Sequence, residues 1–87
     1  MDKNQVIEKL YSILSEIKED NSLTSNLNES SNLIDDVGID SLQMISLMID
    51  IEKEFFIELN FSQINISHMN SIGSLADFIL QQKKIEV

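Results

Sequence analysis

The sequence predicts an all-α protein, a small bundle of three main helices plus one short helix. Apolar residues recur at helical spacing in three stretches of the chain. Proline is absent, and glycine occurs only at positions 38 and 73, so little in the composition interrupts helices. The chain has 87 residues, the size of one small domain, and we expect a single domain over 1–87.

The first helix is expected over about 3–19. Its apolar residues form one stripe for a core, namely Val6, Ile7, Leu10, Ile13, Leu14 and Ile17. Polar residues end this helix, and a long loop follows, which is rich in Ser and Asn from Asn21 to Asn32. A loop this long in a small domain is often functional. Its apolar residues are expected to plug the core, and they are Leu23, Leu27, Leu33 and Ile34.

The second helix, expected over about 40–55, carries more apolar residues than one core-facing stripe requires. One face has the spacing of a core stripe and consists of Met44, Leu47, Met48, Ile51 and Phe55. Leu42, Ile45 and Ile49 form a second ridge at the same helical spacing. A small bundle has no obvious way to bury both ridges. We therefore expect the second ridge to meet a partner protein.

The end of the chain is expected to form a short helix around 62–66 and a last helix from about Ser71 to residue 84. Ser71 is a favourable N-cap residue. The inward side of the last helix is expected to consist of Ile72, Leu75, Ala76 and Ile79. Lys83 and Lys84 then lie near the helix C-terminus, where the dipole favours cations.

The charge is strongly acidic, with 15 acidic side chains, six lysines, no arginine and a net charge of −9. Between Glu29 and Glu58 there are eight acidic residues and one lysine. Such a surface repels nucleic-acid phosphates and anionic lipid headgroups, so we expect neither a nucleic-acid nor a membrane partner. It attracts basic proteins and speeds their docking, although the excess of acid is also explained by solubility alone.

Several kinds of site and location are disfavoured by what the sequence lacks. There is no cysteine, no apolar run of the ~20 residues that span a bilayer, and no signal or lipidation motif. These features fit the cytoplasm, which is the location we expect. Neither His68 nor the acidic residues Asp35, Asp36 and Asp40 have metal-site spacing. No acid–base or nucleophile–base pair is apparent, so we expect no metal site and no catalytic residue.

Ser41 lies where the second helix is expected to begin, and it has two interpretations. Its hydroxyl can accept a hydrogen bond from a free backbone N–H and so cap the helix. Asp40 can do the same, which leaves Ser41 free to point outward. A helix N-terminus also suits a phosphate ester, because its N–H groups and dipole favour negative charge.

The segment Asp36-Val37-Gly38-Ile39-Asp40-Ser41-Leu42 resembles the attachment motif of the acyl and peptidyl carrier proteins. The similarity extends to the preceding Leu33-Ile34-Asp35, to Glu52-Lys53-Glu54-Phe55 and to the closing segment 71–79. In that family the serine of Asp-Ser-Leu carries 4′-phosphopantetheine through a phosphodiester. The resemblance implies that Ser41 is the covalent attachment residue, flanked by the motif residues Asp40 and Leu42.

The resemblance implies an acyl carrier, not an enzyme, that holds acyl or aminoacyl intermediates as thioesters on the arm. The implied partners are a phosphopantetheinyl transferase, an acyl- or aminoacyl-loading ligase, and condensing or acyltransferase enzymes. We expect a monomer whose partner-binding face consists of Leu42, Ile45, Ile49 and Glu52. The alternative of another class is a small acidic helical adaptor without a prosthetic group. An adaptor explains the charge and the second ridge, but not Asp-Ser-Leu at a helix start.

The chain departs from the carriers of fatty acid synthesis in four places. Those carriers often have acidic residues at the positions of Gln43 and Ser46, and here Lys53 interrupts the later acidic run. The segment 58–70 looks slightly longer than theirs. These departures favour a specialised pathway, whether polyketide, nonribosomal peptide or unusual acyl, over a housekeeping role in fatty acid synthesis.

Overall fold

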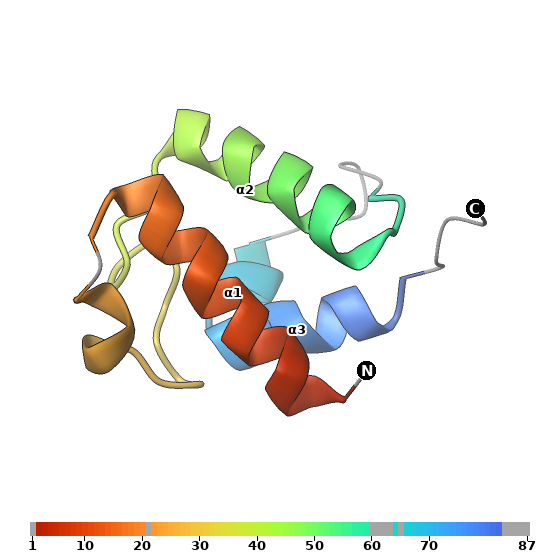
Figure 1. Ribbon diagram of the computed structural model, residues 1–87, viewed down its shortest axis with the longest axis horizontal. Helices are drawn as coiled ribbons and strands as arrows, with labels where there is room; N and C mark the ends of the chain where they lie inside the picture. The colour runs from red at the N-terminus through yellow and green to blue at the C-terminus, as the bar shows by residue number, and fades with distance from the viewer. Residues whose placement is uncertain (1, 21, 60–63, 65, 83–87) are drawn as a thin grey trace.

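Three α-helices and their connections build the protein in a computed structural model, which describes residues 2–20, 22–59, 64 and 66–82 (Figure 1). The elements in chain order are α1 (Lys3–Lys18), the 3₁₀ helix η1 (Leu23–Asn26), α2 (Ser41–Phe55), the 3₁₀ helix η3 (Ile66–Met69) and α3 (Ile72–Leu80). This arrangement confirms the predicted small all-α bundle. η1 lies in the first loop, where the sequence predicts no helix.

α1 packs against both α2 and α3 (Figure 1). A reciprocal cap begins it: the Asp2 carboxylate accepts a hydrogen bond from the Gln5 N–H at 2.9 Å, and the Gln5 amide oxygen accepts one from the Asp2 N–H at 3.0 Å. The predicted stripe is confirmed, with Val6, Ile7, Leu10, Ile13 and Leu14 buried and Ile17 half-buried. α1 ends at Lys18, one residue earlier than expected.

The predicted core face of α2 is also confirmed. Leu47, Met48 and Ile51 are at most 1% exposed. Phe55 is buried too, and Met44 is half-buried against the same cluster. Burial of a side chain of this size stabilises a fold by roughly 1.5–3 kcal/mol, so this face fixes how α2 lies on α1.

The loop between α1 and α2 supplies part of the core, as expected. Leu33 is fully buried and Leu27 is half-buried against the cluster. The side chain of Leu23 lies outside the described residues. Val37 and Ile39, which the sequence analysis did not assign to the core, are 6% and 5% exposed. The segment just before Ser41 is therefore anchored by its own apolar side chains.

The expectation for Ile34 is wrong, because its side chain is 40% exposed. The cause is a local turn at Asn32, whose side-chain oxygen accepts hydrogen bonds from the Ile34 and Asp35 N–H groups, both at 2.8 Å. The adjacent Leu33 is the residue that this turn leaves in the core.

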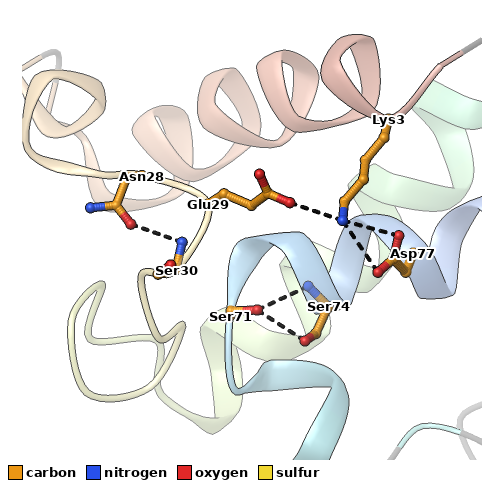
Figure 2. A network of polar contacts seen from close by, with 7 residues as sticks. All are labelled: Lys3, Asn28, Glu29, Ser30, Ser71, Ser74 and Asp77. Carbon is orange, nitrogen blue, oxygen red and sulfur yellow. Dashed lines mark hydrogen bonds and ion pairs between the residues drawn. The ribbon is translucent and has the colours of Figure 1, made fainter.

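α3 begins at the predicted cap, where the Ser71 hydroxyl accepts a hydrogen bond from the Ser74 N–H at 3.0 Å (Figure 2). The inward residues are confirmed, with Ile72, Leu75, Ala76 and Ile79 all buried. Phe78 is buried as well, and its ring centroid lies 4.2 Å from that of His68 in η3.

The last helix ends at Leu80, earlier than the expected end near residue 84. The N–H groups of Gln81 and Gln82 make short-range bonds to Phe78 and Ile79, and the Gln82 side chain donates to the Phe78 carbonyl at 2.8 Å. These bonds satisfy the last carbonyls and so close the helix. Lys83 and Lys84 lie outside the described residues, as does most of the short helix expected at 62–66. The described short helix of that connection is η3.

A polar network fastens the first loop to the start of α1 and to α3 (Figure 2). The Lys3 ammonium lies 2.8 Å from a Glu29 carboxylate oxygen and 3.3 Å from Asp77. Its hydrogen bonds to Glu29 and then to Asp77 raise the pKa of Lys3 above its ordinary value. The Gly73 N–H also donates to the Glu29 carbonyl at 2.9 Å. The loop is therefore held at a point remote in sequence from Ser41.

Phe56 closes α2 in an unfavourable conformation, with φ at 53° and a side chain that is 62% exposed. Left-handed backbone costs a non-glycine residue roughly 1–2 kcal/mol, and glycine is the preferred residue there. A Phe56→Gly variant should therefore be more stable by about 1 kcal/mol, measured by urea unfolding. Glu19 has the same φ of 53° at the end of α1. Glu19→Gly is therefore the matched control, because it relieves the same backbone conformation without removing an aromatic ring. A loss of stability in Phe56→Gly would show that the exposed ring makes a stabilising contact.

Candidate functional site

Ser41 is the first residue of α2 and its side chain is exposed. Asp40 precedes it as the N-cap, and its carboxylate accepts a hydrogen bond from the Gln43 N–H at 2.8 Å. The Gln43 amide oxygen in turn accepts from the Asp40 N–H at 3.2 Å. The structure therefore selects the second interpretation of Ser41: Asp40 caps the helix, and no described residue forms a hydrogen bond with the Ser41 hydroxyl.

The segment that leads to Ser41 is held by its own hydrogen bonds. The Asn32 N–H donates to the Asp36 carboxylate at 2.7 Å, and the Asp36 N–H donates back to the Asn32 carbonyl at 2.9 Å. The Ile39 N–H donates to the Leu33 carbonyl at 3.0 Å. Gly38 has φ at 83°, a backbone conformation that side chains disfavour, which explains a glycine in this turn. The hydrogen bonds and the glycine turn of the preceding segment therefore fix the position of the start of α2.

Lys18, in the last turn of α1, contacts residues on either side of Ser41. The sequence did not predict this contact. Its ammonium group donates to the Gly38 carbonyl at 2.9 Å and to the Gln43 amide oxygen at 3.2 Å. The contact partners are 20 and 25 residues away along the chain. No helical periodicity or local motif indicates a contact of that range.

A surface hollow of about 460 Å³ adjoins the serine and is lined by Ile34, Ile39, Asp40, Ser41 and Met44. Its wall is mostly apolar, and the exposed Ile34 is part of it. Beside this hollow lies the N-terminus of α2, where backbone N–H groups favour negative charge. The hydroxyl is therefore accessible and lies in surroundings that suit a phosphate ester.

The second ridge of α2 lies on the surface, as the sequence predicts. Leu42 is 78% exposed, Ile45 55% and Ile49 42%. Glu52 is half-buried, and its carboxylate accepts a hydrogen bond from the Leu59 N–H at 3.0 Å. Glu52 therefore has an internal contact in addition to its predicted place on the partner face. The binding role of these four residues stays a prediction.

Among the described residues, no helix is long and apolar enough to cross a membrane. No group of three or more His, Asp or Glu side chains in the same residues could hold a metal ion.

Comparison with known proteins identifies the family. A family model described as "Phosphopantetheine attachment site" matches residues 8–79. The chain is 30% identical over 86 residues to the acyl carrier protein of Thermotoga maritima, covering 95% of both chains. It is 29% identical over 80 residues to aminoacyl carrier protein 1 of Bradyrhizobium diazoefficiens, covering 92% of this chain and 83% of that one.

A solved structure shares the fold. The apo doublet acyl carrier protein from prodigiosin biosynthesis matches with a TM-score of 0.70 at 21% identity. The match covers 97% of this chain, which spans 41% of the doublet. The described helices and the family match both indicate a small helical carrier domain. The chain belongs to the phosphopantetheine attachment-site family of carrier domains, which are not enzymes and which carry a covalently attached 4′-phosphopantetheine.

Proposed function

We propose that the chain is an acyl carrier protein that holds 4′-phosphopantetheine on Ser41 through a phosphodiester. The observation that carries the proposal is the division of roles at the start of α2. Asp40 supplies the cap, and the Ser41 hydroxyl is left exposed and without a hydrogen bond to any described residue. In a family whose domains carry this group, that hydroxyl is the best-placed nucleophile at the matching motif.

The residues around Ser41 fit a phosphodiester. Free N–H groups in the first turn of α2 stabilise negative charge there. Gly38 and the bonded turn before it hold the serine at the surface, where a second protein can reach it. No described side chain is hydrogen-bonded to the hydroxyl as a base, so the transferase must activate it. When attached, the arm supplies a terminal thiol for thioester chemistry, and the chain itself has no cysteine to compete with it.

The test is the intact mass of the protein before and after incubation with a broad-specificity phosphopantetheinyl transferase, Mg²⁺ and coenzyme A. We expect a gain of one phosphopantetheine group per chain, and peptide mapping should place it on Ser41. A transferase that modifies a reference carrier but leaves this chain unchanged would favour the adaptor alternative instead.

We further propose that a single domain over 1–87 acts as a monomer in the cytoplasm and meets its partners through α2. The face consists of Leu42, Ile45, Ile49 and Glu52. Its exposed apolar side chains lie on a strongly acidic chain, which suits partners with an apolar patch and basic residues around it. The expected partners are the transferase, a loading ligase for acyl or aminoacyl groups, and condensing or acyltransferase enzymes.

A specialised pathway is the finer proposal, with housekeeping fatty acid synthesis as its alternative. Supporting it are the similarity to a protein named an aminoacyl carrier and the fold shared with a carrier named for prodigiosin biosynthesis. The similarity to proteins named simply acyl carrier protein supports the alternative. Ser46 is neutral and exposed, whereas Gln43 is half-buried in the cap and bonded to Lys18. Of the two neutral positions, Ser46 is therefore the better one for testing which pathway the chain serves.

Malonyl transfer separates the two pathways. With the malonyl acyltransferase of a fatty acid synthase, we expect kcat/KM for this chain, once modified, to be lower than for a fatty acid carrier. A tenfold difference, or about 1.4 kcal/mol, is the expected size, because an exposed acidic contact is missing at Ser46. Ser46→Glu should recover part of it. Equal rates for this chain and the fatty acid carrier would support the housekeeping role.

A further inference from the structure

We propose that Lys18 is a positioning residue for the modification of Ser41, a proposal that rests on the function proposed above. Its ammonium group bonds to backbone and side-chain oxygens on both sides of the serine. The Gly38 carbonyl lies three residues before Ser41, and the Gln43 amide lies two residues after it. One side chain of α1 therefore links the turn before Ser41 to the first turn of α2.

The contact with Gln43 also fixes the helix cap. The same Gln43 oxygen accepts from the Lys18 ammonium at 3.2 Å and from the Asp40 N–H at 3.2 Å. Two donors on one oxygen hold the amide in the orientation that completes the reciprocal cap. Hydrogen bonds that involve a charged group are stronger than neutral ones, so the ammonium is the stronger of the two donors.

The contact with Gly38 acts on the turn before the serine. The Gly38 carbonyl belongs to a residue in the left-handed conformation, and the Lys18 ammonium lies 2.9 Å from it. Without this donor the carbonyl loses its bond to α1, and the turn has fewer constraints. We expect Ser41 to spend less time in the arrangement that a transferase binds, and apparent affinity falls with that fraction.

Lys9 provides a matched control on the same helix. Its ammonium lies 2.6 Å from a Glu54 carboxylate oxygen, so it also links α1 to α2, but near the opposite end of α2 from Ser41. Lys18→Met and Lys9→Met each remove one positive charge and keep most of the apolar stem. Only the first touches the segments around Ser41.

For the Lys18→Met variant, loss of charge predicts faster modification by the transferase, whereas loss of positioning predicts slower modification. Removing a lysine makes an acidic carrier more acidic, which should speed its encounter with a transferase that docks through basic residues. That effect is shared by both variants. A slower modification in Lys18→Met alone is therefore not explained by charge.

The experiment measures kcat and KM for modification by a broad-specificity phosphopantetheinyl transferase with coenzyme A, below the melting range of every variant. For Lys18→Met we expect KM to rise roughly fivefold with little change in kcat. Lys9→Met should match the native chain or show a lower KM. At about 1 M salt the Debye length is ~3 Å, so the charge effect should vanish while the Lys18 defect remains.

Lys18→Arg should restore KM, because a guanidinium can still donate to both oxygens. If Lys18→Met fails to fold, Lys18→Ala serves in its place, since alanine has no side-chain donor and loses both contacts. Equal KM values for the Lys18 and Lys9 variants, with the native chain modified normally, would overturn the positioning role. Failure of the native chain to be modified at all would instead overturn the proposed function.

Discussion

A Ser41→Ala variant is expected to keep the native fold and to accept no phosphopantetheine group. The fold should survive because Asp40, not Ser41, caps α2. The Ser41 side chain is exposed, and alanine is readily accommodated in a helix. We expect the free energy of unfolding to change by no more than about 0.5 kcal/mol. Modification should be lost completely, because the only hydroxyl in the motif is removed.

Intact mass and thermal melts check the two halves of this expectation, and Asp40→Ala is the complementary control. That variant keeps the hydroxyl and removes the cap, so it should lose about 1 kcal/mol of stability and still gain mass. Persistent labelling of Ser41→Ala would place the attachment on another residue. A large loss of stability in Ser41→Ala would mean that the serine hydroxyl has a structural role.

The helices and their core faces could be predicted from the sequence because both follow from local periodicity. The predicted core face of α2 has five apolar residues and the second ridge only three, and Leu47, Met48 and Ile51 of the larger set are buried. Loops have no such periodicity. Leu33 and Ile34 are adjacent and equally apolar, and the Asn32 turn determines which of them enters the core.

Only part of the candidate site could be predicted from the sequence. Asp40 and Ser41 belong to a contiguous motif at a helix start, so the sequence alone identifies them. The sequence left open which of the two caps the helix, since both side chains are good caps. Lys18 could not be found this way, because its contacts with Gly38 and Gln43 depend on how α1 lies against α2.

Leu47→Ala is expected to destabilise the protein severely, whereas Ile45→Asp should leave the fold nearly intact. Leu47 is fully buried. We expect its replacement by alanine to lower the free energy of unfolding by roughly 2–5 kcal/mol, because burial is lost and a cavity is left behind. Small domains are stable by only about 5–15 kcal/mol, so much of the total is at stake. Each kcal/mol lost lowers the melting temperature of a domain this size by roughly 4–8 °C.

Ile45 is 55% exposed on the second ridge, so an aspartate there stays in water and costs less than about 1 kcal/mol, mostly in helix propensity. Its effect should appear in docking instead, as a raised KM for the transferase, because the apolar contact with the partner is replaced by a charge that must be desolvated. Melting curves and modification kinetics on both variants separate the two roles. If Ile45→Asp melts as early as Leu47→Ala, the ridge is part of the core, and α2 has no apolar face left for a partner.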